Sequence, residues 1–275
     1  MNAKNLRPRK ALGQNFLIDP STAEMIIRKS GVGKADVALE IGAGLGALTV
    51  PLSNAAKSVY AIEKDPAIAD VLEAELNARG IENVILANED VLDIDLAAIA
   101  GRENQRLMVF GNLPYYISSQ VLICLINAHA FICQADLMFQ KEVAHRLIAG
   151  PGTKSYSRLT VMLQYYTEIH RTATVNAHLF WPAPKVDSEV LQFIFKREIN
   201  PAVRDPDLFA AVVKAAFGRR RKTLLNAMSS GELNIPRQDL LHVFEASGID
   251  SGSRAESLSV DQFVELTNTI DAYQA

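Results

Sequence analysis

The sequence predicts an α/β fold: a mostly parallel sheet with helices on both faces, followed by a small all-helical C-terminal domain. The 275 residues suffice for one large or two modest domains. From Asp36 to about Gln140, short apolar runs alternate with longer helical patterns, which is typical of βαβ units. From Asn200 onward the periodicity is helical throughout. We therefore place a domain boundary near residue 198, between a 1–198 domain and a 199–275 domain.

Four short apolar runs are predicted to form the parallel strands. They are too brief for ordinary helices, and parallel central strands are apolar on both faces. A fifth strand is expected at Ala135–Phe139, and alternating apolar residues predict a sixth near 187–195 whose direction is compatible with antiparallel pairing. The four parallel strands are Val37–Ile41, Ser58–Ile62, Val84–Ala87 and Leu107–Phe110.

The helix between Asp65 and Arg79 has the clearest predicted boundaries. Asp65 is a good N-cap, Pro66 suits the first turn, and Gly80 ends the helix. In the second domain, Gly, Ser and Pro separate four helical patterns. These helices are expected at 206–217, 219–229, 236–247 and 259–271.

Composition excludes several classes of protein. A hydrophobic fraction of 49% and a charged fraction of 21% are typical of globular proteins. No apolar run approaches the roughly 18 residues of a membrane span, and the N-terminus has no apolar signal-peptide core. Cys124 and Cys133 are too few for a disulfide framework and lack zinc spacing. The five histidines are dispersed, so we expect a cytoplasmic protein without a metal site.

The net charge of −3 conceals a strong segregation of charge. Four basic residues precede the first acid, Asp19, and Lys214 with the run Arg219–Lys222 adds five more. After Gly231 the balance reverses to eight acids against two arginines. Such asymmetry predicts a local anionic partner rather than indiscriminate binding to nucleic acid.

A glycine-rich turn follows the first predicted strand. Gly42, Gly44 and Ala47 satisfy the loose dinucleotide fingerprint, in which glycines allow a tight turn and close approach of a ligand. Glu63 stands 21 residues after Gly42, where a carboxylate accepts hydrogen bonds from ribose hydroxyls. NAD and S-adenosylmethionine share that ribose, so this pattern does not separate them. A turn that caps a helix and binds nothing is the alternative.

Polar residues follow four of the predicted strands. Gly42, Glu63, Asp90 and Asn112 each stand just beyond a different strand. Because ligands of open α/β sheets bind at the carboxyl ends of the strands, we expect these four residues to gather around one ligand. Asp90 is placed to accept from an adenine amine, although the adjacent Glu89 competes for that role. Solvated loop acids are the alternative.

The segment Asn112-Leu113-Pro114-Tyr115 suits chemistry on an adenine amine, whose lone pair is delocalised into the ring. The Asn112 side-chain oxygen and the Leu113 carbonyl can accept its two protons and orient the nitrogen toward a methyl donor. Tyr115 can stack on an adenine that has been extruded from its strand. A proline turn with packed aromatic residues is the alternative.

Four segments together resemble the S-adenosylmethionine-dependent rRNA adenine dimethyltransferases, and among them the bacterial small-subunit enzymes. They are Gly13–Leu17, Glu40–Gly46, Asn112–Tyr115 and Phe180–Val186, and the likeness covers nearly the whole chain. It implies a Rossmann-like methyltransferase domain that binds S-adenosylmethionine through Asn15, Leu17, Gly42, Glu63, Asp90 and Asn112. Phe180 is the candidate for the second face of a base that stacks on Tyr115, and an aromatic residue packed in a rigid proline loop is the alternative. Tyr116 departs from the family, where we expect Asn more often, but it lies outside the catalytic signature.

The resemblance implies dimethylation of two adjacent adenosines in the 3′-terminal hairpin of small-subunit 16S rRNA, with a role in ribosome biogenesis. The amine would attack the methyl group in line without a strong general base, and catalysis would come mainly from positioning. The partner would be small-subunit rRNA in immature small subunits, bound in part by the helical domain, and we expect a monomer. Basic residues expected to contact phosphates are Arg7, Arg9, Lys10, Arg219, Arg220, Arg221 and Lys222. A solvated face remains the alternative for one or two residues of the run.

Three other functions remain open on sequence grounds. A NAD-dependent oxidoreductase would use the same glycine turn and Glu63. A ribosome-assembly factor would depend on binding to immature small subunits rather than on methylation. A methyltransferase of large-subunit rRNA, as in macrolide resistance, would share most of the motifs.

Overall fold

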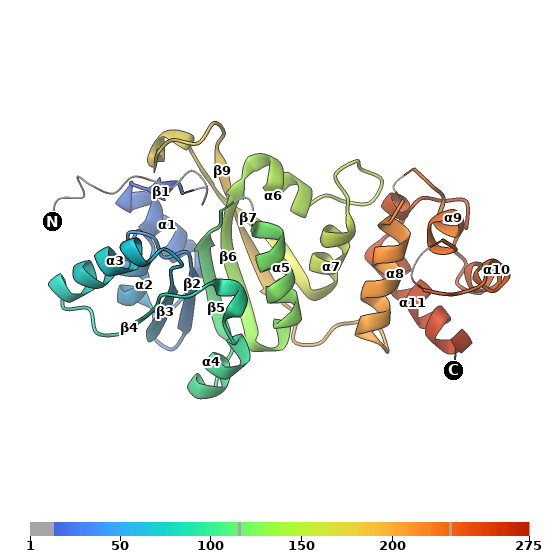
Figure 1. Cartoon of the computed structure of the whole chain (residues 1–275), viewed down its shortest axis with the longest axis horizontal. Coiled ribbons are helices and arrows are strands. Elements are labelled where there is room, and N and C mark those ends of the chain that lie inside the picture. The colour runs from blue at the N-terminus through green and yellow to red at the C-terminus, as the bar shows by residue number, and fades with distance from the viewer. Residues whose placement is uncertain (1–13, 115–116, 220, 231–232, 275) are drawn as a thin grey trace. The chain divides into compact units, whose positions relative to one another are not determined.

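A computed structural model describes residues 14–114, 117–219, 221–230 and 233–274 (Figure 1). The chain divides into two compact units. The first contains the described residues up to Ala144 together with Thr167–Arg197, and the second contains His145–Tyr166 together with the described residues from Glu198 onward.

The first unit is built on a seven-stranded sheet with the order β4-β3-β2-β5-β6-β9-β7. The strands from β4 to β6 are parallel, and the antiparallel β9 pairs with both β6 and β7. This arrangement confirms the predicted fold class, and β5 runs two residues further than expected, to Asn112. The strands are β2 (Val37–Ile41), β3 (Ser58–Ile62), β4 (Val84–Ala87), β5 (Leu107–Asn112), β6 (Ile132–Gln140), β7 (Thr167–Val175) and β9 (Ser188–Phe195).

The chain changes direction across the sheet between β2 and β5. From β2 it proceeds outward to β3 and β4, and it then returns to place β5 on the other side of β2. Ile41 lies opposite Gly111 in the pairing of these two strands. Gly42 and Asn112 therefore emerge side by side, at the kind of position where ligands of open α/β sheets bind.

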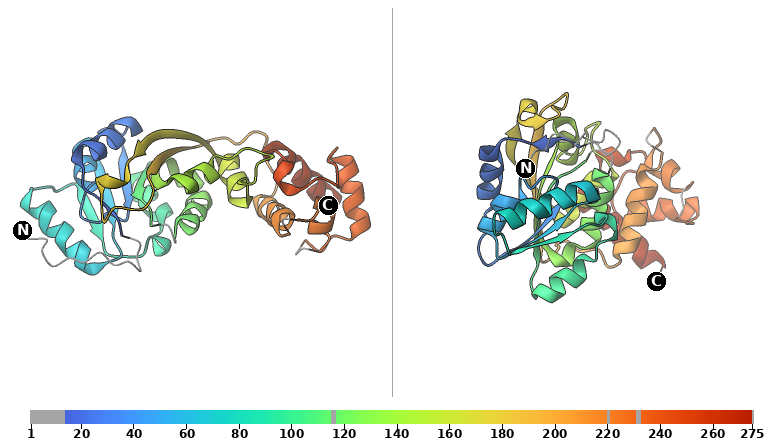
Figure 2. Two further views of the ribbon diagram at one scale, coloured as in Figure 1. Left: turned by 90° about the horizontal axis from the view of Figure 1, so that it is seen from above. Right: turned by 60° about the vertical axis from the view of Figure 1, so that its left-hand side comes forward.

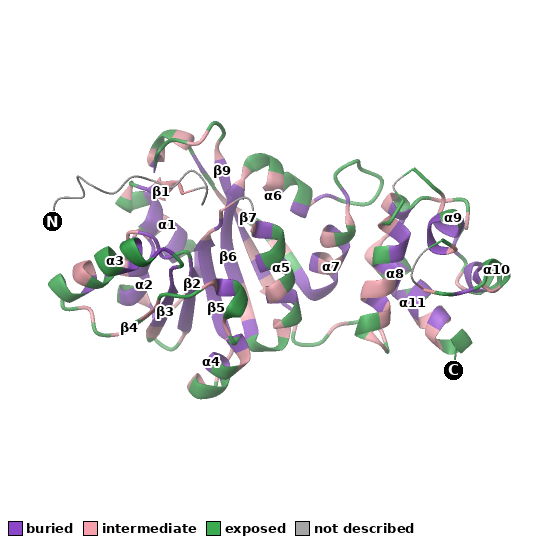
Figure 3. Cartoon of the chain, in the orientation of Figure 1, coloured by how far each residue is buried: buried purple, intermediate pink, exposed green. Residues whose placement is uncertain are grey.

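Helices cover both faces of this sheet (Figure 2). Helices α1 (Pro20–Ser30) and α2 (Thr49–Ala55) share one apolar core with Val59 of β3 and Phe110 of β5. The next residue along β3, Tyr60, points to the opposite face, where its hydroxyl donates to Glu103 of α4 (Leu96–Glu103) at 2.8 Å. The central strands are consequently buried along their length (Figure 3).

Helix α3 (Pro66–Ala78) follows its predicted boundaries closely. The Asp65 side chain accepts from the Ala67 amide, and Pro66 occupies the first turn. Gly80, with φ of +65°, lies just beyond the end of the helix, where a left-handed conformation is needed. The buried Leu72 packs in a small core that includes Ala61 of β3.

A separate two-stranded antiparallel sheet joins β1 (Phe16–Leu17) to β8 (Phe180–Trp181). Phe16 lies opposite Trp181, and Leu17 lies opposite Phe180. This pairing ties two of the motif segments together. The other helical segments of the first unit are η3 (Val91–Asp93), α5 (Ser118–Asn127), η4 (His129–Phe131) and η5 (Ala177–Leu179). Helix α6 (Lys141–Leu147) begins in the first unit and ends in the second.

Asp136 is a carboxyl group buried within the sheet, on β6. Its two oxygens accept from the side-chain amides of Gln134 at 2.6 Å and Gln192 at 3.2 Å. Burial raises the pKa of Asp136 to about 6, and these hydrogen bonds oppose the rise. Asp136 is thus a buried carboxyl group whose two oxygens both have partners.

The second unit is helical and encloses its own aromatic core. Phe209, Phe244 and Phe263 are buried, and the ring of Phe217 stacks on that of Phe263 with 5.8 Å between centroids. The helical segments are α7 (Arg158–Tyr166), α8 (Pro206–Phe217), α9 (Leu224–Met228), α10 (Arg237–Ala246), η6 (Ala255–Ser257) and α11 (Val260–Gln274).

The compact units differ from the predicted domains in one segment, 145–166, which belongs to the second unit. The Tyr165 ring of α7 packs against Phe209 with 4.4 Å between centroids, and its hydroxyl accepts from the Val203 amide at 2.9 Å. Aromatic packing therefore groups α7 with helices that begin some forty residues later in the sequence. A single boundary near 198 does not account for this segment.

The helix predicted at 219–229 is wrong in its first half, because α9 begins only at Leu224. Arg219, Arg221 and Lys222 lie in a turn before it, where the Lys222 amide donates to the Arg219 carbonyl at 2.9 Å. These three basic residues are thus presented on a turn rather than around a helix axis.

No helix among the described residues is long and apolar enough to cross a membrane. The same part of the chain contains no cluster of three or more His, Cys, Asp or Glu side chains suited to a metal ion.

Candidate active site

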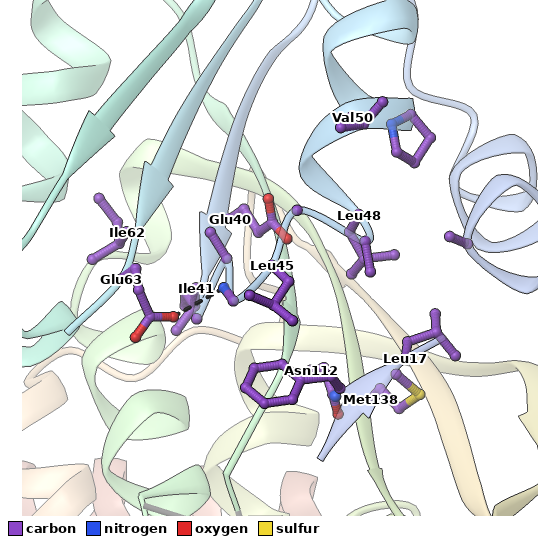
Figure 4. Close-up of a pocket in the computed structure, with 18 of the residues that line it drawn as sticks. Leu17, Glu40, Ile41, Leu45, Leu48, Val50, Ile62, Glu63, Asn112 and Met138 are labelled. Atoms are coloured by element: carbon purple, nitrogen blue, oxygen red, sulfur yellow. Dashed lines mark hydrogen bonds between the residues drawn. The ribbon is translucent and has the colours of Figure 1, made fainter. Parts of the chain in front are cut away.

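A cavity of about 830 Å³ opens at the carboxyl ends of β2, β3 and β5 (Figure 4). The structure brings all six residues predicted to bind cofactor into its lining. They come from four strand ends and the N-terminal motif, as expected for a ligand site at the point where the chain reverses across the sheet. These residues are Asn15, Leu17, Gly42, Glu63, Asp90 and Asn112.

The glycine turn has a backbone that other residues adopt only with strain. Gly42, Gly44 and Gly46 have φ values of +72°, +57° and +87°. A Cβ on Gly44 would stand 3.3 Å from the Phe16 ring, and one on Gly46 would stand 2.8 Å from Leu72. The glycines therefore let β1 and α3 approach the turn closely, and they keep side chains out of the cavity wall.

Glu63 holds the glycine turn in place. One carboxylate oxygen accepts from the Gly44 amide at 2.9 Å, and the other accepts from the Asp65 amide at 2.8 Å. The side chain is buried but lines the cavity. Each carboxylate oxygen has a second lone pair, so Glu63 retains the capacity to accept from ribose hydroxyls.

Asp90 also lines the cavity and begins η3. One oxygen accepts from the Leu92 amide at 3.1 Å, and the other forms an ion pair with Lys64. The hydrogen bond from Lys64 keeps the pKa of Asp90 below its usual value. Its neighbour Glu89 is exposed and lines the same cavity.

Asn112 has an amide whose orientation is fixed by the N-terminal motif. Its Nδ2 donates to the Asn15 main-chain carbonyl at 2.8 Å. Because a carbonyl can only accept a hydrogen bond, the amide nitrogen of Asn112 must face Asn15. The Oδ1 atom therefore points away from Asn15. Leu113 is also anchored, since its amide donates to the Met138 carbonyl at 3.3 Å.

Phe180 is a predicted catalytic residue that the structure does not bring to the cavity. Its side chain is 3% exposed and belongs to the apolar core that contains Leu17 and Met138. The adjacent Trp181 lines the cavity instead and is 49% exposed. In this conformation Trp181 is the aromatic side chain of β8 that is accessible to a base.

Several predicted site residues lie outside the described residues or outside the first unit. Tyr115, Arg7, Arg9, Lys10 and Arg220 fall in segments that the structure does not describe. Arg219, Arg221 and Lys222 are exposed on the second unit.

The lining residues that are not predicted as site residues include Phe16, Glu40 and Trp181. The two aromatic residues stand within motif segments, but nothing in the sequence indicates that they pair across β1 and β8. Glu40 does carry a signal, because it is an acid inside a strand that is otherwise apolar.

The family model described as ribosomal RNA adenine dimethylase matches residues 5–272. The chain belongs to this family. A relative from Desulforapulum autotrophicum, ribosomal RNA small subunit methyltransferase A, is 43% identical over 98% of this chain and 94% of its own. A protein of the same name from Geobacter sulfurreducens is 41% identical over 97% of this chain and 96% of its own.

Two solved structures of related enzymes share the fold over nearly the whole chain. A dimethyladenosine transferase from Plasmodium falciparum superimposes with a TM-score of 0.81 at 26% identity, covering 94% of this chain and 98% of its own. The 23S rRNA methyltransferase ErmE superimposes with a TM-score of 0.69 at 25% identity, covering 93% of this chain and 99% of its own.

The adenine dimethylase is an S-adenosylmethionine-dependent rRNA methyltransferase, which confirms the predicted enzyme class and cofactor. The alternative of a NAD-dependent oxidoreductase is wrong. The cavity also fits the cofactor on structural grounds. Its glycine turn leaves room for a ligand, and the Glu63 carboxylate can accept from a ribose. Glu40, whose Oε2 atom is buried without a hydrogen-bond partner, is also one of its lining residues.

Proposed function

We propose that this dimethylase acts on small-subunit rRNA and dimethylates the exocyclic amines of two adjacent adenosines in its 3′-terminal hairpin. The observation that carries the proposal is near-full-length identity of 43% to a protein named as a small-subunit methyltransferase. Identity to the 23S enzyme is 25%. Immature small subunits as the binding partner, a monomeric state and a cytoplasmic location are part of the same proposal.

Asn112 is proposed to orient the target amine. The hydrogen bond from its Nδ2 to Asn15 leaves Oδ1 as the acceptor for one amine proton, and the Leu113 carbonyl would accept the other. Two acceptors at fixed positions hold the nitrogen lone pair toward the methyl group, which removes much of the entropic cost of alignment. Tyr115 is proposed to stack on one face of the base.

For the second face of the base, Trp181 is accessible at the cavity, whereas Phe180 is buried. For Phe180 to stack on the second face of the base, as predicted, β8 would have to rearrange when RNA binds. This role of Phe180 remains a proposal.

The cofactor is proposed to bind along the strand ends, with Glu63 at the ribose, Asp90 at the adenine, and Asn15, Leu17 and Gly42 lining the remaining wall. Bound S-adenosylmethionine supplies a methyl group that is already activated by the positive charge on sulfur. The amine proton becomes acidic as the nitrogen is alkylated, so the scheme needs no strong general base.

Nucleoside mass spectrometry tests the substrate directly. The protein and S-adenosylmethionine are incubated with unmethylated small subunits and, in parallel, with large subunits and DNA. We expect N,N-dimethyladenosine in the small subunit alone. Methylation of the large subunit would overturn the substrate but leave the fold and family intact. Binding of cofactor and subunit without methylation would favour the assembly-factor alternative.

Glu63→Ala is expected to weaken cofactor binding by roughly 1.5–3 kcal/mol, because it removes a charged acceptor and frees the Gly44 amide. Isothermal calorimetry with S-adenosylmethionine measures the change. Glu82→Ala is the control, since Glu82 is an exposed acid that does not line the cavity. Equal affinities for wild type and Glu63→Ala would remove Glu63 from the binding site.

The exposed basic turn of the second unit, formed by Arg219, Arg221 and Lys222, is proposed to bind RNA phosphates. The affinity for RNA falls as the salt concentration rises, and replacing Arg221 and Lys222 with alanine should make this fall less steep. On a plot of log affinity against log salt concentration, the slope should lose up to about 0.9 in magnitude for each phosphate contact removed. Cofactor affinity should be unchanged, because neither residue lines the cavity. Arg237→Ala is the control, as this arginine instead donates to Asn226. An unchanged slope would show that the turn is merely solvated.

A further inference from the structure

Glu40 is a buried carboxyl group in the wall of the cavity. It stands on β2 between Ala61 of β3 and Phe110 of β5, directly before the glycine turn. The side chain is 2% exposed, and its Oε2 atom has no hydrogen-bond partner. Figure 4 shows its carboxylate on the side of Leu48, apart from the Glu63 carboxylate that binds the turn.

The surroundings of Glu40 provide no compensating positive charge among the described residues. The groups that act on it are the Thr49 hydroxyl of α2 and the like charge of Glu63. Thr49 is itself buried, and its Oγ1 atom also lacks a hydrogen-bond partner. An ionised carboxylate in such a place is costly, because its Oε2 atom gives up hydration without gaining a hydrogen-bond partner.

The neutral form of Glu40 is therefore favoured in the free protein. Burial raises its pKa to about 8, the charge of Glu63 adds to the rise, and the Thr49 hydroxyl opposes it. At pH 7 the protonated form of Glu40 therefore predominates in the free protein. The buried Asp136 differs, because both of its oxygens accept from side-chain amides.

We propose that Glu40 is the buried counter-charge for the cationic part of the cofactor, and that it releases a proton to solvent when the cofactor binds. The proposal rests on the proposed binding of S-adenosylmethionine in this cavity. The balance is simple: the carboxylic acid becomes a carboxylate, its proton passes to the buffer, and no covalent bond to the cofactor forms. A cation next to Oε2 supplies the partner that the free protein lacks.

A pH dependence of affinity follows from this coupling. Below the pKa of free Glu40, binding must first remove a proton, so the association constant should rise about tenfold per pH unit. Above about pH 8 Glu40 is already ionised and adds no further increase. The affinity should then level off if the sulfonium is the partner, and it should fall as the cofactor ammonium loses its own proton if the ammonium is the partner. The charged group that faces Glu40 is Glu63, whose carboxylate is held by two backbone amides.

Calorimetry in buffers of different ionisation enthalpy counts the released protons. At pH 7, S-adenosylmethionine should release close to one proton from the wild-type protein and close to none from Glu40→Gln. The affinity of Glu40→Gln should also be nearly independent of pH. Asp136→Asn is the matched control, because it removes a buried carboxyl that does not line the cavity. This variant should still release the proton.

Infrared difference spectroscopy on the wild-type protein gives a second readout that needs no variant. The carbonyl band of a protonated carboxyl should disappear when cofactor is added. S-adenosylhomocysteine, which has the ammonium but not the sulfonium, identifies the charge involved. Release with both ligands assigns Glu40 to the ammonium, and release with S-adenosylmethionine alone assigns it to the sulfonium.

Two results would overturn the proposal. One is cofactor binding with no proton release and no loss of the carboxyl band. The other is release that persists in Glu40→Gln, which would assign the proton to another group. Failure of the cofactor to bind at all is a different result, and it would contradict the proposed function rather than the role of Glu40.

Discussion

Replacing Asn112 with alanine is expected to slow methyl transfer at least about a hundredfold, which corresponds to roughly 2.7 kcal/mol of transition-state stabilisation. The change removes the Oδ1 acceptor and the hydrogen bond to Asn15. Single-turnover transfer at saturating S-adenosylmethionine separates this effect from any change in cofactor affinity. Binding of the variant to immature small subunits should persist. Loss of methylation together with subunit binding and assembly would contradict a separate assembly role.

Asn112→Asp tests whether orientation matters in addition to acceptor capacity. Aspartate keeps an oxygen at the Oδ1 position but places a second oxygen against the Asn15 carbonyl, where the wild-type amide donates. Two acceptors repel, so the side chain should rotate and the aspartate variant should be nearly as slow as the alanine variant. Near-normal transfer by Asn112→Asp would show that the hydrogen bond to Asn15 has no part in positioning the amine.

The sheet is predictable because its strands carry a strong local signal. The runs at Val37–Ile41, Ser58–Ile62 and Val84–Ala87 begin and end as expected. Parallel strands buried on both faces are nearly continuous in apolar residues, and few other structures are so short and so apolar. The two-residue strands β1 and β8 have no periodicity, and their pairing depends on contacts between residues more than 160 positions apart.

Helical periodicity places α8, α10 and α11 to within a few residues, but it misplaces the start of α9. The window 219–229 contains four basic residues that tolerate a helix, and nothing local marks the turn. The amides of Leu224 and Leu225 instead donate to the carbonyls of Ser253 and Ser251. The helix therefore begins where tertiary hydrogen bonds allow, and a local pattern does not report such bonds.

The candidate site is predictable in its plan, because the residues after parallel strands converge at one edge of the sheet. The side-chain details require the structure. Glu63 and Asp90 are predicted to face a ligand, and each also holds backbone amides. Phe180 and Trp181 are neighbours in the sequence, and the pleat of β8 sends one into the core and the other to the cavity. Which residue goes which way depends on the pairing with β1.

Gly111→Ala is expected to destabilise the first unit strongly. Gly111 lies opposite Ile41 where β5 meets β2, and an added Cβ would stand 2.8 Å from the Ile41 carbonyl oxygen. Backbone atoms between two buried strands have little room to move away. Overpacking of this kind typically costs about 1–3 kcal/mol of unfolding free energy. Urea denaturation measures the decrease.

The same substitution should also impair catalysis, because the next residue is Asn112. If β5 moves away from β2 to relieve the contact, the Asn112 amide moves relative to the glycine turn, and a displacement of about 1 Å can cost a hundredfold in rate. Gly101→Ala in α4 is the control. Apart from its chain neighbours and the backbone of its own helix, no heavy atom lies within 4 Å of its Cβ position. Alanine in a helix is favoured over glycine by up to about 1 kcal/mol. The control should be at least as stable as wild type and fully active. Normal stability and transfer in Gly111→Ala would show that the contact between β2 and β5 at the cavity edge is looser than the structure indicates.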